Sequence, residues 1–294
     1  MTLRALAPAK VNLSLFLGGT RADGRHRLVT VFESLSLADT LELEVIEGPE
    51  DLVVCHGVEG ENLAARALAA LRARGWDGPP VQISIEKRIP VAAGMAGGSA
   101  DAAAALRLAM ALAPGRAEEV DQIAAELGAD VPSQLLPGVA LGTGAGEIVE
   151  HFEPLPEHAF VVLPAEVGLS TPDVFREADR LGLQRSSEEL DELYEELVAA
   201  LAPDPELPDR LLVNDLEPAA VSLCPGCGDA LDAMRAAGAE HAMVSGSGPT
   251  VVGIWWGLGA VGRAFAAAHR LRADYPLALG AEPVTAEYAA ASLT

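Results

Sequence analysis

Lysine is rare in this chain, and both lysines lie beside segments whose residue types could carry out chemistry. Lysine and arginine together number 20, and only Lys10 and Lys87 are lysines. An ammonium is a compact point charge whose pKa can shift, whereas a guanidinium is a planar, permanently charged group. Where arginine is the default cation, a retained lysine is a candidate functional residue. The alternative is a compositional bias in which two lysines survive by chance.

The segment after Lys87 has the pattern of an anion-binding loop. Residues 81–86 alternate apolar and polar side chains, as in a strand, and Pro90 precedes the run Gly94-Met-Ala-Gly-Gly-Ser-Ala-Asp101. We expect a helix from Ala102 to Ala113, because this stretch is nearly all Ala, Leu and Met. Glycine lets the backbone approach a phosphate, and the first turn of a helix offers free N–H groups and a partial positive charge.

Local pattern alone leaves two interpretations of this loop. Ser99 would add a hydroxyl contact to an anion, and Asp101 would cap the helix. The spacing of the glycines matches neither the P-loop nor the dinucleotide-binding pattern. A glycine turn before a buried alanine helix is the structural alternative.

Lys10 begins a second segment with chemical potential. Residues 11–17 alternate apolar side chains with Asn12 and Ser14, which predicts a half-buried strand, and a glycine turn leads to a second strand at residues 28–37. A secretory signal is disfavoured, since the apolar stretch is short and broken by polar residues.

Asp130 stands in Gly128-Ala-Asp-Val-Pro132, directly after a predicted helix from Ala117 to Leu127. One interpretation is a helix N-cap with proline in the first turn. The other is a carboxylate held at a helix start and available as a general base. Later in the chain, Ser245-Gly-Ser-Gly248 precedes the apolar strand 251–256 and by itself predicts a turn.

Composition narrows the class of protein. A formal net charge of −23 argues against nucleic-acid binding, and no apolar stretch is long enough for a membrane helix, so we expect a cytoplasmic protein. The acidic segment 186–197 has leucines at helical spacing and predicts a solvated helix. Two prolines within residues 152–157 indicate a domain boundary. Three cysteines are too few for a disulfide scaffold, so Cys224-Pro-Gly-Cys227 is expected to hold ordinary thiols in a turn.

Together these segments resemble the GHMP kinases, small-molecule kinases named after galactokinase, homoserine kinase, mevalonate kinase and phosphomevalonate kinase. Three motifs occur in the family's order: Pro8-Ala-Lys10-Val-Asn12-Leu, the run from Pro90 to Ala102, and Ser245-Gly-Ser-Gly248. Residues 21–26, 128–132 and 214–217 are similar to members that phosphorylate a cytidine-diphosphate-linked alcohol. The resemblance covers essentially the whole chain.

The resemblance implies an α+β fold of two domains, residues 1–154 and 155–294. Each would hold a mixed or antiparallel sheet with helices on one face, and the active site would lie in the cleft between them. We expect a monomer or a homodimer.

The resemblance also implies transfer of the γ-phosphoryl group of ATP to the C2 tertiary hydroxyl of a methylerythritol moiety. Asp130 would be the base and Lys10 the cation beside that hydroxyl. The implied nucleotide-binding residues are Asn62, Lys87, Pro90, Gly94, Met95, Ala96, Gly97, Gly98 and Ser99. The implied substrate-binding residues are Asn12, Arg25, His26, Phe32, Thr171 and Phe175. Mg²⁺ would accompany ATP, with Asp101, Ser99 and Glu147 as open alternatives for its ligands.

Several positions depart from the family's pattern. Arg25 stands where the family usually has a tyrosine that stacks on the cytosine, although a guanidinium plane can also stack on a ring. Ala92, Ala93 and Ala96 stand where glycine is common, which matters only where the backbone has positive φ or must approach a ligand. Two alternatives remain: a kinase for homoserine or a mevalonate-type alcohol, and a nucleotide-binding relative without catalysis.

Overall fold

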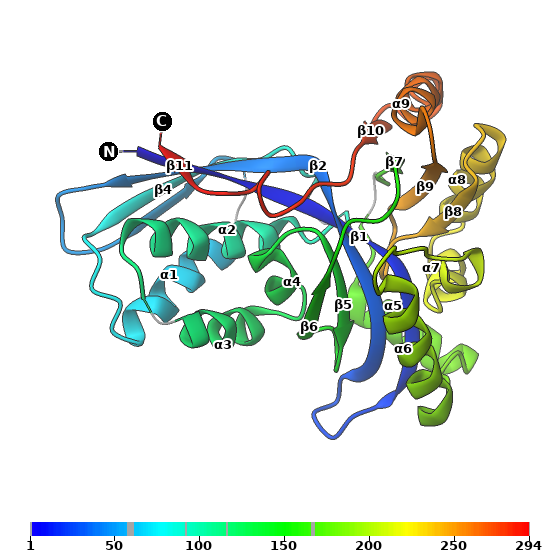
Figure 1. Cartoon of the computed structure of the whole chain (residues 1–294), viewed down its shortest axis with the longest axis horizontal. Coiled ribbons are helices and arrows are strands. Elements are labelled where there is room, and N and C mark those ends of the chain that lie inside the picture. The colour runs from blue at the N-terminus through cyan, green and yellow to red at the C-terminus, as the bar shows by residue number, and fades with distance from the viewer. Residues whose placement is uncertain (1, 58–61, 92, 116, 166–167, 294) are drawn as a thin grey trace.

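Two β-sheets, each covered by helices, make up the protein (Figure 1). The computed structural model describes residues 2–57, 62–91, 93–115, 117–165 and 168–293. None of the helices in these ranges has the length and apolarity needed to span a bilayer. The two-sheet architecture confirms the predicted α+β class.

The first sheet is built around two long strands, β1 (Thr2–Thr20) and β2 (His26–Val45), which pair antiparallel along most of their length. The order is β11-β1-β2-β4-β3, and β5 pairs with β2 and β6 with β5. Only the β3–β4 pair is parallel among these pairings. The remaining bounds are β3 Leu52–Cys55, β4 Val81–Glu86, β5 Val139–Thr143, β6 Ile148–Phe152 and β11 Ser292–Leu293.

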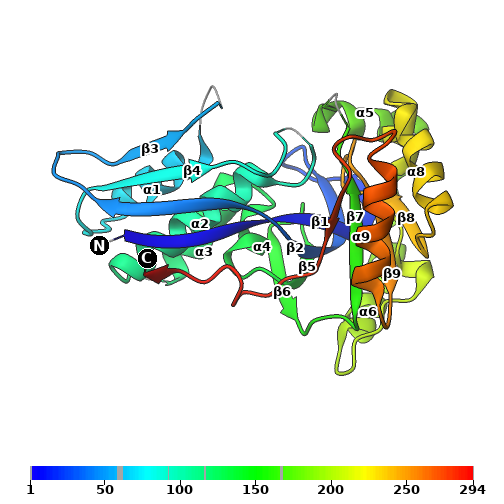
Figure 2. The same cartoon turned by 90° about the horizontal axis from the view of Figure 1, so that it is seen from above.

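Helices α1, α2 and α3 lie together on one face of this sheet (Figures 1 and 2). Their apolar side, rich in alanine and leucine, packs against residues such as Leu41, Leu43 and Ile83 of the strands. Small alanine side chains allow helix α2 to approach the strands closely, which buries nearly all of residues 100–109. The bounds are α1 Leu63–Ala73, α2 Gly97–Leu112, α3 Ala117–Leu127 and α4 Val131–Leu135.

The second sheet is antiparallel throughout, in the order β10-β7-β9-β8. Strand β7 alternates between two cores: Ala159, Val161 and Leu163 face helices α5, α7, α8 and α9, whereas Phe160 and Val162 face strands β1 and β2 and helix α6. The bounds are β7 His158–Leu163, β8 His241–Val244, β9 Val251–Trp256, β10 Leu279–Ala281, α5 Thr171–Leu181, α6 Ser187–Leu201, α7 Glu217–Leu223, α8 Gly226–Ala236 and α9 Ala260–Leu271, with a 3₁₀ turn at Asp209–Leu211.

The two halves are joined by a shared apolar core and by backbone pairing. The Leu15 N–H donates to the Val213 carbonyl at 2.7 Å, and the Asp215 N–H donates to the Leu15 carbonyl at 2.9 Å. At the other end of the molecule β11 returns to pair with β1, so the two termini lie side by side (Figures 1 and 2). The last strand therefore belongs to the first sheet, and the division at residues 154 and 155 stays a prediction.

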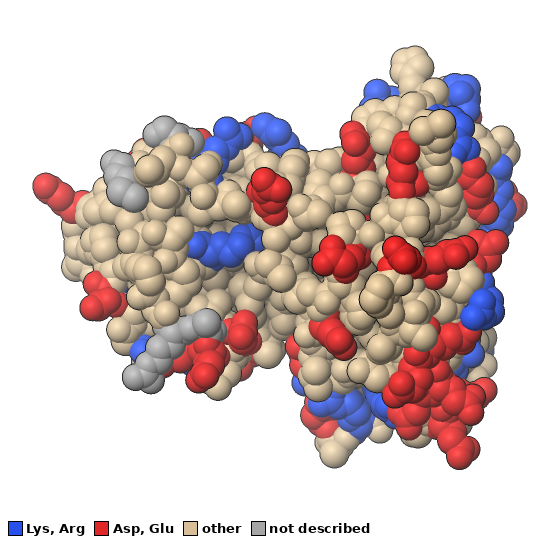
Figure 3. Space-filling model, in the orientation of Figure 1, with Lys and Arg blue, Asp and Glu red and all other residues tan. Residues whose placement is uncertain are grey.

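The predicted elements are recovered with different bounds: β1 and β2 are longer than the predicted strands at residues 11–17 and 28–37. Helix α2 begins at Gly97, five residues before the expected Ala102, because the glycines themselves form its first turn. Strands β5 and β6 are joined by a turn in which Gly144 and Gly146 have positive φ. Helix α6 has the predicted amphipathic pattern, with Leu190 and Leu197 buried. Figure 3 shows acidic side chains gathered over this helix at the lower right.

Candidate active site

Two adjoining cavities contain nearly all of the predicted site residues. The larger, of about 690 Å³, is lined by Lys10, Asn12, Arg25, His26, Phe32, Asp130, Thr171 and Phe175 among others. The smaller, of about 320 Å³, is lined by Asn62, Lys87, Pro90, Gly94, Met95, Ala96, Gly97 and Gly98 among others. Gly94 and Ala96 border both. Of the described residues predicted to bind nucleotide or substrate, Ser99 alone lines neither cavity.

Lys10 and Asp130 face each other in the larger cavity. The Lys10 Nζ lies 3.6 Å from Asp130 Oδ1 and 2.8 Å from Asn12 Oδ1, to which it donates. Lys10 is buried on β1, and its ammonium lies 5.3 Å from the centre of the Phe32 ring. The backbone N–H of Lys10 donates to the carbonyl of Met95 at 3.2 Å, which ties this strand to the glycine loop.

Asp130 occupies the N-cap position of helix α4 but, within the described chain, its carboxylate makes no capping hydrogen bond. The carboxylate is 36 % exposed and borders the cavity, so it remains available to a ligand. Of the two interpretations that the sequence left open, the geometry favours the carboxylate in a site.

Asn12 is held rigidly between the two halves. Its backbone N–H donates to Ser245 Oγ at 3.0 Å, and its Nδ2 donates to Thr30 Oγ1 at 2.8 Å. Asn214 donates from Nδ2 to the carbonyls of Val244 and Gly246, which fixes the Ser245–Gly248 turn beside the cavity. The third glycine motif is therefore part of the site rather than only a turn before a strand.

The glycine loop meets this turn at van der Waals distance. A Cβ placed on Gly94 would lie 2.5 Å from the Gly248 carbonyl oxygen, and Gly94 has φ +75°. Thr250 also donates from its hydroxyl to the Ala93 carbonyl. Ala96, the N-cap residue of helix α2, has φ 55°, a conformation that glycine would adopt without strain. Ala92 lies outside the described residues.

Lys87 is neutralised by two carboxylates. Its Nζ lies 2.5 Å from Asp39 Oδ2 and 2.7 Å from Asp101 Oδ2. Burial lowers the pKa of Lys87, but Asp101 and Asp39 outweigh it and the pKa is raised. Burial raises the pKa of Asp101 to about 7 against the opposing effect of Lys87. Asp101 therefore lies within helix α2 and pairs with Lys87. The sequence-based prediction that Asp101 caps this helix is wrong.

Asp39 is the residue in this cluster that sequence reasoning missed. It is fully buried, and its Oδ1 accepts from the backbone N–H groups of Arg88 and Ile89 at 2.5 and 2.8 Å. It thereby holds the chain leading into the glycine loop. It lies inside β2, two residues beyond the end of the strand that the sequence predicts, and its local pattern gives no signal of this role.

An aromatic pair also lines the larger cavity. The His26 and Phe175 rings stack with centroids 5.1 Å apart, and His26 Nε2 lies 2.7 Å from Asp179 Oδ1. Thr171 Oγ1 lies 3.0 Å from Ser247 Oγ. Helix α5 and the start of β2 thus bring together His26 and Asp179, which are 153 positions apart in the chain, at the end predicted to bind the base.

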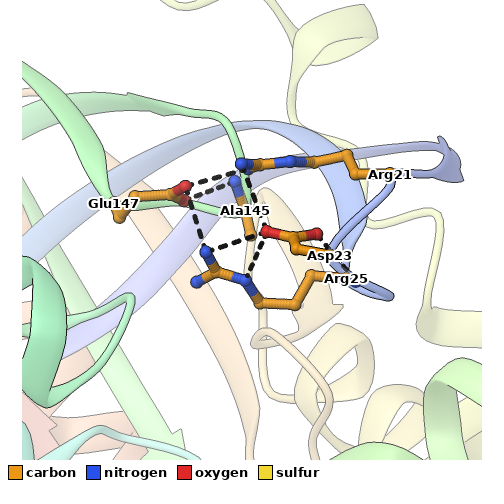
Figure 4. Close-up of polar contacts among 5 residues, drawn as sticks. All are labelled: Arg21, Asp23, Arg25, Ala145 and Glu147. Carbon is orange, nitrogen blue, oxygen red and sulfur yellow. Dashed lines mark hydrogen bonds and ion pairs between the residues drawn. The ribbon is translucent and has the colours of Figure 1, made fainter.

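Arg25 belongs to a cluster of four charges at the cavity edge (Figure 4). Glu147 Oε1 accepts from Arg21 Nη1 at 2.8 Å and from Arg25 Nη2 at 3.5 Å, and Asp23 accepts from the Arg25 Nε at 3.1 Å. Glu147 Oε2 also accepts from the Ala145 N–H at 2.5 Å. These contacts hold the β1–β2 hairpin against the β5–β6 turn. Both carboxylate oxygens of Glu147 already accept hydrogen bonds, so Glu147 is a poor candidate for a metal ligand.

Comparison with known proteins identifies the family. Residues 62–138 match the model of the GHMP kinase N-terminal domain, and residues 193–272 match that of the GHMP kinase C-terminal domain. The chain therefore belongs to the GHMP kinase family, and its relatives within the family place it among the 4-diphosphocytidyl-2-C-methyl-D-erythritol kinases.

Those relatives cover most of the chain. The enzymes of that name from Streptomyces avermitilis and Streptomyces coelicolor are each 45 % identical to it, over 85 % of this chain and 86 % of theirs. A crystal structure of 4-(cytidine 5'-diphospho)-2C-methyl-D-erythritol kinase superposes with a TM-score of 0.76 at 35 % identity, covering 95 % of this chain and 98 % of that one. Homoserine kinase from Cytophaga hutchinsonii shares the fold, with a TM-score of 0.73 at 18 % identity over 99 % of this chain and 97 % of that one.

Proposed function

We propose that this protein transfers the γ-phosphoryl group of ATP to the 2-hydroxyl of 4-diphosphocytidyl-2-C-methyl-D-erythritol, a step in the non-mevalonate formation of isoprenoid precursors. The observation that carries the proposal is the junction of the two cavities. A nucleotide-sized space and an acceptor-sized space meet at Gly94 and Ala96, and the Lys10–Asp130 pair borders the larger space.

The chemistry follows from the positions of these groups. ATP in the smaller cavity would place its phosphates against the glycine loop and the free N–H groups at the start of helix α2. The acceptor hydroxyl would lie beside Asp130, whose carboxylate takes its proton as the oxygen attacks the γ-phosphorus. Lys10, held by Asn12, stabilises negative charge on that oxygen and on the transferred group.

The aromatic and hydroxyl groups that line the larger cavity support the choice of acceptor. Recognition of a pyrimidine needs aromatic surface and hydrogen-bonding groups, and the His26–Phe175 stack with Thr171 and Ser247 supplies both. Homoserine and mevalonate carry no ring to use this surface. The described part of the chain forms both cavities by itself, so the proposal requires no partner subunit. Because the reaction uses ATP, we place it in the cytoplasm.

Mg²⁺ is the metal that the family implies. Among the described residues no group of three His, Cys, Asp or Glu side chains could hold an ion alone. A Mg²⁺ that arrives with ATP needs only one or two protein oxygens, because phosphates and water supply the rest. Asp101 fits, since its buried Oδ1 has no hydrogen-bond partner among the described residues, and Ser99 lies in the first turn of the same helix. Bound there, the ion would neutralise phosphate charge.

The test is ATP turnover with three acceptors: the cytidyl compound, homoserine and mevalonate. We expect turnover with the first alone. Asp130→Asn should reduce kcat by about 10² to 10⁴ while ATP still binds, and Asp232→Asn, on an exposed carboxylate of helix α8, is the matched control. Turnover of homoserine would indicate the sister kinase, and ATP binding with no turnover of any acceptor would indicate a non-catalytic relative.

A further inference from the structure

The turn that joins helices α7 and α8 places two thiols together behind the Ser245–Gly248 turn. Cys224 ends helix α7, and Cys227 lies in the first turn of helix α8. The Cys227 N–H donates to the Cys224 carbonyl at 2.9 Å, which closes a tight four-residue turn. Such a turn holds its first and fourth Cα atoms within about 7 Å, close to the range that a disulfide spans.

The two thiols differ in their surroundings. Cys224 is partly exposed, whereas Cys227 is 2 % exposed. Cys227 Sγ donates to the carbonyl oxygen of Pro249 at 3.5 Å. Burial, followed by the neighbouring Cys224 thiol, raises the pKa of Cys227 to about 12, so the thiol keeps the proton that it donates.

The acceptor of this hydrogen bond connects the thiols to both cavities. Pro249 follows Gly248, whose carbonyl oxygen lies against Gly94, and precedes Thr250, whose hydroxyl donates to Ala93. Helix α7 touches the same turn, because a Cβ on Gly248 would lie 3.5 Å from Ala220 Cβ. A change at the α7–α8 turn therefore reaches the loop that separates the two cavities.

We propose that Cys224 and Cys227 form a redox-sensitive dithiol site, which a low-molecular-weight disulfide oxidises to an intramolecular disulfide that loosens the Ser245–Gly248 turn. The more exposed Cys224 attacks the disulfide R–S–S–R and releases one R–SH. Cys227 then displaces the second R–SH, so two thiols and one disulfide give one protein disulfide and two small thiols. The Cys227 sulfur loses its proton in this step, and with it the hydrogen bond to Pro249.

The proposal differs from the sequence-based expectation, in which Cys224 and Cys227 are ordinary thiols in a turn. A zinc site does not explain them, because no group of three ligating side chains occurs among the described residues. The proposal is also independent of the kinase assignment in its first part, since disulfide formation is measured on the protein itself. The effect on turnover rests on the proposed function.

The experiment treats the purified protein with oxidised glutathione and maps thiols by peptide mass spectrometry. We expect a Cys224–Cys227 linkage that dithiothreitol reverses. Cys227→Ser should instead retain glutathione on Cys224, and Cys224→Ser should form no linkage. In parallel, kcat/KM should fall about two- to fivefold on oxidation, because one weak buried hydrogen bond is lost. It should recover on reduction. The kcat/KM of the Cys224→Ser protein should not change when oxidised glutathione is added.

Three results would overturn the proposal. The first is glutathione on Cys55 while Cys224 and Cys227 remain reduced. The second is a stable glutathione adduct on Cys224 in the unsubstituted protein, without closure. The third is complete linkage with unchanged kcat/KM and unchanged thermal midpoint. If no acceptor is turned over, the thermal midpoint of the oxidised and reduced proteins, with and without ATP, still tests whether the linkage alters the loop.

Discussion

Gly94 is a position where one added methyl group should have a measurable effect on both stability and turnover. In Gly94→Ala the new Cβ would lie 2.5 Å from the Gly248 carbonyl oxygen, whereas Cβ atoms essentially never approach a neighbour within 3.0 Å. The neighbouring atom is backbone, so the two loops must separate. The residue also has φ +75°, which alanine adopts at a cost of about 1 kcal/mol. Adding about 1–3 kcal/mol for overpacking gives a loss of about 2–4 kcal/mol in the free energy of unfolding.

Gly75→Ala is the matched control. Gly75 has φ +85°, but among the described residues nothing lies within 4 Å of where its new Cβ would stand. This variant should therefore lose only the backbone cost of about 1 kcal/mol. Urea unfolding of both variants gives the two free energies, and the difference between them isolates the contact between the loops.

The same pair of variants tests the catalytic consequence. Gly94 borders both cavities, so separating the loops displaces the nucleotide relative to the Lys10–Asp130 pair. A displacement of about 1 Å can cost about 10²-fold in rate, so kcat/KM should fall strongly in Gly94→Ala and stay unchanged in Gly75→Ala. Equal unfolding free energies for the two variants, together with equal kcat/KM values, would refute the reasoning.

Three further predictions concern the neighbouring groups. Ala96→Gly should raise the free energy of unfolding by about 0.5–1 kcal/mol, because φ 55° costs glycine nothing, and urea unfolding that shows a loss would contradict this. Asp101 has a folded pKa of about 7 against a usual 3.8, so the folded state binds more protons between these values and stability falls as pH rises from about 4 to 7. Asp101→Asn should give a flatter stability profile over that same range of pH, measured by urea unfolding. Glu147→Gln should weaken the contacts to Arg21 and Arg25 and raise KM for the cytidyl substrate about three- to tenfold with little change in kcat; a fall in kcat with unchanged KM would place Glu147 in the chemistry instead.

Local pattern was sufficient for the elements that carry the site. The alternation around Asn12 predicts strand β1, and the Ala- and Leu-rich stretch after Gly98 predicts helix α2, because these features depend on near neighbours in the chain. The helix start was misplaced by five residues, since glycine has a poor intrinsic propensity for helix and only the packing of α2 against the sheet places Gly97 and Gly98 in its first turn.

Some assignments needed partners that are distant in the sequence. The local pattern at Asp130 fitted a cap and a base equally, and only the approach of Lys10 from β1 gave its carboxylate a partner in the cavity. Lys87 was chosen as a site residue, but its ammonium is bound by Asp39 and Asp101, which lie 48 and 14 positions away. Asp39 was missed because its role depends on the contact with Lys87, a residue far away in the sequence. The sequence around Asp39 does not show that this contact forms.

The sequence by itself determined which residue types were available for phosphoryl transfer: two lysines among many arginines, three glycine-rich turns and one carboxylate at a helix start. The tertiary structure decided which of them meet. Hydrophobic burial packs β7 and helix α6 against β1 and β2, and that packing brings the Ser245–Gly248 turn to the glycine loop and Phe175 to His26. Those contacts depend on how many residues pack together in the core. A sequence motif contains only a few neighbouring positions and therefore cannot predict them.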